Sequence, residues 1–355
     1  MWTNKFIRIL ICFCLFIPGI PVFPQIGGNQ IFKFLELAPS ARITGLGGSL
    51  VNVKDHDVAS AYLNPALLNE SMDQQISFQH QFHVADIQSG FAAWGKTWSE
   101  SNFTGYIAAQ YIFYGQFDQT DEFGNQTGVF SGKEAAITIG LGYPLYDKLS
   151  IGANLKVISS SLENYQAWGV AMDAGAFYLD SASNFSVSLV FRNAGAQIKS
   201  YTGAQKEDLP FQIIAGISKR LRYLPFRFSI IYHHLNQWNL LYNDPSTEES
   251  GFLFGITPNE NNPGGFDNFF RHLIFGGELF VGSNDILSFR VAYNHQRKQE
   301  LALNNVRSLT GFSIGFGIHL KILDFNYALN KIHIGGTSHH IGFATSLQRF
   351  TGTKI

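Results

Sequence analysis

The chain has 355 residues and a formal net charge of −1, and only 14% of its residues are charged. An ordinary soluble domain carries about 25% charged residues, whereas aromatic residues here reach 15% and glycine occurs 35 times. The near-neutral balance and the lack of a basic patch argue against nucleic acid as a partner. Many aromatic residues and glycines with little charge favour a protein built of many strands with an apolar outer surface.

The N-terminus has the pattern of a secretory signal. Lys5 and Arg8 precede the uncharged run 9–17, and a Pro/Gly break follows. This run is too short for a membrane-spanning helix, which needs about 20 apolar residues. We therefore predict a signal peptide over residues 1–24 and Sec-dependent export. Both cysteines lie inside this segment, so the mature chain is expected to contain no disulfide.

Residues 25–73 lack a clear alternation of apolar and polar residues. They contain an apolar cluster at 31–37, a break at 38–40, a glycine-rich stretch at 45–48 and a second apolar stretch at 61–66. We predict short helices joined by a turn and an extended piece. Such a segment in front of a barrel can fold into the lumen as a plug, and a small periplasmic cap outside the barrel is the alternative.

From residue 74 onward, apolar residues recur at every second position. This period of two is typical of strands whose two faces meet different media. In a soluble sandwich the apolar face would form the core, whereas in an outer-membrane barrel it would face lipid. The fourteen candidate strands lie near 75–83, 88–98, 102–113, 134–144, 148–160, 166–179, 184–194, 210–220, 225–235, 270–281, 286–297, 308–319, 321–330 and 338–348.

The connections between these strands distinguish the two folds. Those on the side of the N-terminus are all short, whereas those on the other side include the long stretches 114–133 and 236–269, and only 84–87 is expected to be short there. Short turns that alternate with longer loops are typical of outer-membrane barrels. We therefore predict an all-β fold, a fourteen-stranded antiparallel transmembrane β-barrel over 74–350, followed by a C-terminal tail at 351–355.

The same parity assigns six charged residues to the barrel interior. An Arg or Lys on the lipid face at the bilayer midplane costs about 2 to 4 kcal/mol, so these residues are expected inside. Three are basic and three are acidic, which favours ion pairs that brace the barrel and plug over an ion-selective pore lined by one sign of charge. The candidate lumen charges are Lys156, Asp173, Arg192, Glu278, Arg290 and Asp324.

Two patterns suggest chemistry only weakly. Residues 311–315 match G-x-S-x-G, but the alternation runs straight through them, whereas a nucleophile needs a sharp strand-to-helix turn. Two adjacent histidine pairs, 233–234 and 339–340, are expected to point to opposite faces of their strands, and no Cys/His spacing typical of a metal site occurs. We expect no catalytic residue, cofactor or metal; a barrel lipase would need Ser313 beside a histidine.

The longest expected loop, 236–269, is the best candidate docking surface. It combines acidic and aromatic residues and contains no Lys or Arg. Calcium or a partner protein could use such a surface, and a merely solvated acidic loop is the alternative. The residues singled out are Trp238, Tyr242, Asp244, Phe252 and Asp267.

Several short stretches, in order, carry a family resemblance. They are Gln25-Ile26-Gly27-Gly28, Ala38-Pro39-Ser40-Ala41-Arg42, Gly45-Leu46-Gly47-Gly48, Asn64-Pro65-Ala66, Phe117-Asp118 with Asp121-Glu122, Arg192-Asn193-Ala194-Gly195, Leu209-Pro210-Phe211, Pro225-Phe226-Arg227-Phe228 and His233-His234-Leu235. With them the chain resembles the PorQ family of the Bacteroidetes type IX secretion system, itself similar to FadL-like barrels. The resemblance covers essentially the whole mature chain.

This resemblance implies a non-enzymatic barrel surrounded by outer-membrane lipid. It would belong to the complex that fixes secreted cargo to the cell surface, where it would hold the surface protein PorZ beside the PorU protease and the PorV barrel. No residue is carried over from the family to that contact. The alternative is a FadL-like outer-membrane transporter of a hydrophobic small molecule.

Overall fold

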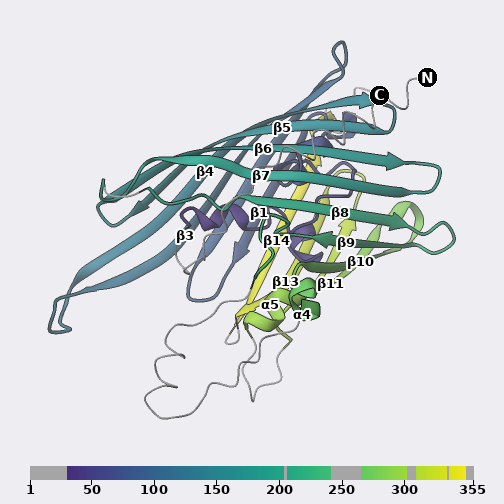
Figure 1. The fold of residues 1–355 in the computed structure, drawn as a ribbon. Helices are drawn as coiled ribbons and strands as arrows, with labels where there is room; N and C mark the ends of the chain where they lie inside the picture. The colour runs from purple at the N-terminus through teal and green to yellow at the C-terminus, as the bar shows by residue number, and fades with distance from the viewer. Residues whose placement is uncertain (1–29, 204–205, 241–264, 302–308, 334–335, 349–355) are drawn as a thin grey trace.

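The chain folds into a closed barrel of fourteen antiparallel strands, in which each strand pairs with its sequence neighbours and β1 closes onto β14 (Figure 1). The predicted fold class is therefore confirmed. No helix in the described part of the chain is long and apolar enough to span a membrane. The computed structural model describes residues 30–203, 206–240, 265–301, 309–333 and 336–348, so the predicted signal peptide and C-terminal tail lie outside it.

The barrel wall follows the alternation of the sequence. Ile137, Ile139 and Leu155 are about half exposed on the outside, whereas Thr138 and Asn154 between them are buried inside. The strands are β1 (Gln75–Phe82), β2 (Gln88–Trp98), β3 (Phe103–Thr120), β4 (Gln126–Tyr146), β5 (Leu149–Leu162), β6 (Tyr165–Asp180), β7 (Phe185–Lys199), β8 (Gln212–Arg220), β9 (Phe226–Tyr232), β10 (Leu273–Val281), β11 (Leu287–Asn294), β12 (Phe312–His319), β13 (Asp324–His333) and β14 (Gly336–Ser346).

The two ends of the barrel differ. The chain enters at Gln75 and leaves at Ser346, which pair with each other at one end, together with short turns such as 147–148 and 320–323. We call this the turn end and the opposite one the loop end. In outer-membrane barrels the short turns face the periplasm.

The loop end differs from the expectation in two ways. The stretch 114–133, expected as a loop, is mostly strand, because β3 and β4 continue as a two-stranded ribbon to a turn at 121–125. Aromatic and β-branched residues such as Phe117 and Val129 suit this extended pairing. Short connections also join β5 to β6 at 163–164 and β13 to β14, so 84–87 is not the single short loop at this end.

Residues 30–73, which we call the luminal segment, lie inside the barrel and pack against its inner face. Leu35, Tyr62 and Leu67 are fully buried there. Capping starts four of the five helices, because the side chains of Ser40, Asp57, Asn64 and Asn69 accept bonds from backbone N–H groups in the first turn. The helices are η1 (Lys33–Glu36), α2 (Ala41–Gly45), η2 (Val58–Tyr62), η3 (Pro65–Leu67) and η4 (Glu70–Met72).

Glycines of the wall allow the luminal segment to approach the strands closely. A Cβ at Gly152 would lie 2.4 Å from the carbonyl carbon of Pro65, which no real side chain tolerates. On the other side, Gly45 of α2 meets Gly315 of β12, where an added Cβ would lie 3.2 Å from the Gly315 Cα. Glycine at these positions therefore permits backbone-to-backbone packing that larger residues would prevent.

Candidate functional site

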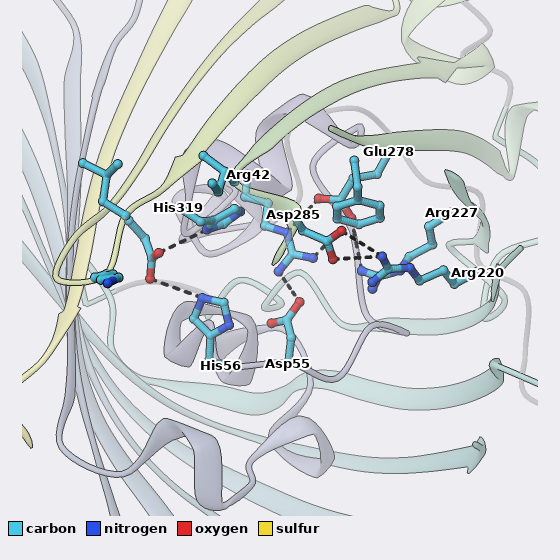
Figure 2. A pocket seen from close by; sticks show the side chains of 13 residues that line it. Arg42, Asp55, His56, Arg220, Arg227, Glu278, Asp285 and His319 are labelled. Carbon is cyan, nitrogen blue, oxygen red and sulfur yellow. Dashed lines mark hydrogen bonds and ion pairs between the residues drawn. The ribbon is translucent and has the colours of Figure 1, made fainter. Parts of the chain in front are cut away.

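A charged cavity of about 540 Å³ opens at the turn end, between the luminal segment and the barrel wall. Its walls come from the luminal segment, strands β8, β9, β10, β12 and β13, and the connections that follow β10 and β12 (Figure 2). Its lining residues are Arg42, Asp55, His56, Arg220, Arg227, Glu278, Phe280, Asp285, Ile286, His319, Leu320, Lys321 and Asp324.

Glu278 is the centre of the charge network beside this cavity. Its carboxylate is 2.8 Å from Nε of Arg290 and 3.1 Å from Nη1 of Arg227, both on neighbouring strands. The same carboxylate accepts two bonds of 3.3 Å from Arg42 of the luminal segment. One buried acid therefore links the luminal segment to three strands, an arrangement that compensates the cost of removing these charges from water.

Arg42 also holds the luminal segment together at its turn-end edge. It forms an ion pair with Asp55. Burial by itself would lower the pKa of Arg42, but the negative charges of Asp55 and Glu278 raise this pKa above its ordinary value. Burial alone would raise the pKa of Asp55, yet the Arg42 guanidinium keeps it below its ordinary value. Both groups are therefore charged at neutral pH.

His56, His319 and Asp324 converge at the edge of the cavity (Figure 2). Asp324 is 3.2 Å from Nε2 of His56 and 3.1 Å from Nδ1 of His319. The hydrogen bond to Asp324 raises the pKa of His56 above 6.5. One carboxylate of the wall therefore faces two imidazoles, one from the luminal segment and one from the wall.

A second charge cluster lies deep in the barrel. The Lys156 ammonium is 2.8 Å from Asp173 and 2.8 Å from the side-chain oxygen of Asn193, and it stands 4.4 Å from the ring centre of Tyr62. Arg192 donates to the carbonyl oxygen of Leu35 at 3.0 Å. This cluster, like that of Glu278, ties the luminal segment to the wall by charged groups.

All six candidate lumen charges have buried side chains on the inner face of the barrel. The structure brings them into three groups: Lys156 with Asp173, Glu278 with Arg290, and Asp324 with two histidines. Arg192 instead contacts the luminal segment. Each acid of the six thus faces a cation or an imidazole.

The candidate docking residues lie at the loop end as far as they are described. Trp238 is 65% exposed, and its carbonyl oxygen accepts bonds from Asn268 and His272. Asp267 lies in helix α4 (Gly265–Arg271), where it pairs with Arg271 at 2.8 Å and with His295 of helix α5 (His295–Glu300) at 2.9 Å. The other three residues, Tyr242, Asp244 and Phe252, lie outside the described residues.

The histidine pair 233–234 differs from its expectation. Strand β9 ends at Tyr232, and His234 has a φ of 55°, so the two rings lie on the same side with centroids 4.8 Å apart. The expectation of opposite faces was wrong because the chain leaves the strand there. Burial lowers the pKa of His234 to about 4, and burial lowers that of His233 as well.

Ser313 of the G-x-S-x-G match lies in the middle of β12. It is buried on the inner face and donates to the side-chain oxygen of Asn330 at 3.2 Å. A nucleophile of this motif would sit at a strand-to-helix turn. The structure therefore gives Ser313 the surroundings of an interior structural residue.

Most of the residues that line the turn-end cavity were not predicted from the sequence. Arg42, Asp55 and His56 belong to the non-alternating stretch, where parity assigns no facing. Arg220 ends β8, and Asp285 lies in the short helix η5 (Ser283–Asp285) between β10 and β11. One residue of the cavity could have been predicted from the sequence: His319 has the parity of the inward residues of its strand, and it pairs in register with Asp324.

Together, the closed antiparallel barrel, its apolar exterior and its charged interior define an outer-membrane β-barrel. Among solved structures, the monoaromatic hydrocarbon channel TodX with a ΔS2S3 mutation overlays with a TM-score of 0.54 at 11% identity, covering 87% of this chain and 99% of that one. The toluene transporter TodX of Pseudomonas putida gives a TM-score of 0.52 at 11% identity, covering 88% and 99%.

A FadL homologue of Pseudomonas aeruginosa overlays less closely, with a TM-score of 0.46 at 12% identity over 86% of this chain and 98% of that one. No family model matches the chain, and no curated protein matches it. At these identities the TodX overlays show a shared fold.

Proposed function

We propose that this protein is a non-enzymatic outer-membrane barrel that holds a partner protein at the cell surface, as expected for a PorQ-like member of the type IX attachment complex. The observation that carries the proposal is the packing of the luminal segment. Its core residues, such as Leu35 and Tyr62, are fully buried against the wall, and the buried ion pair of Arg42 with Glu278 fastens it there. Moving such a segment aside for every solute would break this pair, at a cost of about 3 to 5 kcal/mol.

The loop end supplies a surface for a partner. Strands β3 and β4 have 18 and 21 residues, and 18 residues extend about 60 Å at 3.3 Å per residue. An apolar membrane band is about 25 Å tall, so the ribbon projects well beyond it. Phe117 and Phe123 are exposed on this ribbon, at 42% and 82%, and exposed aromatic residues are typical anchors of protein interfaces.

The expected partner is a surface protein of the PorZ type, in a complex with proteins of the PorU and PorV type. The experiment compares two loop-end variants in cells: deletion of 244–266, and a ribbon shortened by joining Gln116 to Ser131, which face each other in register, through Asn-Gly. We expect at least one variant to release the partner from the outer membrane. The matched control is Lys148→Ala, which changes an exposed ion pair at the turn end.

The release is measured by immunoblotting of outer-membrane fractions and by co-purification with the barrel. Heat-dependent migration on gels reports whether each barrel has assembled, so that loss of the partner is separated from loss of the barrel. If both loop-end variants assemble and retain the partner as the control does, the docking proposal is wrong.

The second candidate is an outer-membrane transporter of a hydrophobic small molecule. One observation favours it: the overlay with the toluene transporter TodX. Saturable binding of toluene or a long-chain fatty acid by the purified protein, and its uptake into vesicles, would establish this function.

A further inference from the structure

The convergence of His56, His319 and Asp324 resembles a ligand set more than a simple ion pair (Figure 2). One nitrogen from each histidine and one oxygen of Asp324 all lie within 4.8 Å of one another. The two imidazole rings are 5.8 Å apart and nearly perpendicular, at 79°. Neither ring therefore stacks on the other, and both direct a nitrogen at the same carboxylate.

Three distant parts of the chain build this set. His56 follows the ion-paired Asp55 in the luminal segment, His319 ends β12, and Asp324 begins β13. His319 and Asp324 face each other in the strand register, so the barrel itself fixes their separation. The wall therefore supplies two prearranged groups, and the luminal segment supplies the third.

The chemistry of the set suits one class of ion. Two imidazole nitrogens and one carboxylate oxygen are ligands that Zn²⁺ accepts, with a fourth position left for water. Ligand atoms around tetrahedral Zn²⁺ stand about 3.3 Å apart, given metal–ligand distances of about 2.0 to 2.1 Å. The two histidine nitrogens are 3.2 and 3.1 Å from Asp324 oxygens, close to the spacing of ligand atoms around that ion.

Burial and access also fit an ion. The Asp324 side chain is 5% exposed, whereas those of His56 and His319 are 41% and 23% exposed toward the cavity. An ion can therefore enter from the turn end and bind a carboxylate that is shielded from water. Arg42, the cation of the luminal segment that lines this cavity, is paired with Asp55 and Glu278.

We propose that His56, His319 and Asp324 bind a divalent transition-metal ion of the Zn²⁺ type, which clamps the luminal segment to the β12–β13 end of the barrel wall. The ion would replace the two histidine–carboxylate contacts by three metal–ligand bonds. Because one ligand belongs to the luminal segment and two to the wall, binding would hold the segment in place from the periplasmic side.

The test uses the full-length barrel in detergent, purified without a polyhistidine tag and stripped with a chelator. Zn²⁺ alone is titrated by calorimetry, and Co²⁺ is titrated as a spectroscopic probe, because tetrahedral Co²⁺ absorbs visible light strongly. We expect one equivalent of each ion to bind. Asp324→Asn and His319→Ala should each weaken Zn²⁺ binding at least 100-fold and abolish the Co²⁺ band, and His56→Ala should weaken it at least tenfold.

The matched control is His295→Ala, which removes another histidine paired with an aspartate, 2.9 Å from Asp267 at the loop end. It should bind Zn²⁺ as the unmodified protein does. Asp324→Asn keeps the shape of the side chain, and gel migration shows whether each variant has assembled. A second readout is proteolysis of the luminal segment, which Zn²⁺ should slow in the unmodified protein and not in His56→Ala.

Two results would overturn the proposal. One is the absence of stoichiometric binding at 100 µM Zn²⁺ in the unmodified protein, which would reduce the cluster to an ion-paired group. The other is binding that persists in assembled Asp324→Asn and His319→Ala, which would place the ion elsewhere. Neither result bears on the partner-holding function, which is tested at the other end of the barrel.

Discussion

Replacing Glu278 by glutamine should weaken the barrel more than any surface change. The carboxylate faces Arg42, Arg227 and Arg290, and its side chain is only 2% exposed. Glutamine keeps the shape but removes the negative charge, so the guanidiniums remain close together in a poorly hydrated site. Breaking a buried pair by removing one partner costs about 3 to 5 kcal/mol, and we expect a loss of that size in the free energy of unfolding.

The assay is urea unfolding in lipid vesicles, followed by tryptophan fluorescence. Lys148→Ala is the control, because Lys148 is 57% exposed and pairs with Asp180 at 2.8 Å; an exposed pair contributes about 0 to 1 kcal/mol. A double-mutant cycle with Arg290→Gln should show coupling, so that the double variant loses less than the sum of the two single losses. A Glu278→Gln barrel within 1 kcal/mol of the unmodified protein would refute this account.

Three further predictions test other parts of the structure. Burial lowers the pKa of His234 from 6.5 to about 4, so the folded state binds fewer protons than the unfolded state between these pH values. The stability present above pH 6.5 should therefore fall by roughly 3 kcal/mol as the pH is lowered toward 4. We expect this loss to appear as faster hydrogen exchange over 233–240, and to be absent in His234→Phe. Gly152→Ala should push the luminal segment off the wall and expose it to protease, because the new Cβ would lie 2.4 Å from Pro65. Gly276→Ala is the control: its Cβ would lie 3.5 Å from the nearest atom, so this variant should behave as the unmodified protein does. Leu155→Arg, on the outer face, should cost about 2 to 4 kcal/mol of folding free energy in vesicles, and a change below 1 kcal/mol would contradict the assignment of that face to lipid.

The sequence by itself determined the wall of this barrel. The alternation in β2, and in the inner parts of β4 and β5, fixed which residues face outward, because a strand has a period of two whatever its neighbours are. It also placed Lys156 and Glu278 inside, since a charge on the lipid face is costly. The extent of the β3–β4 ribbon was missed, because polar residues such as Gln119 and Gln126 are as compatible with a loop as with an exposed strand.

Only the tertiary structure decided which of these residues meet. Glu278 contacts Arg42 across 236 positions of the chain, and the meeting of His56 with His319 and Asp324 likewise depends on how the luminal segment lies in the barrel. The luminal segment has no repeating pattern from which its facing can be predicted, since its short helices are shaped by packing against glycines of the wall. Periodicity is a local property and was readable in the sequence, whereas the turn-end cavity is made of long-range contacts that arise only when the barrel closes around the segment.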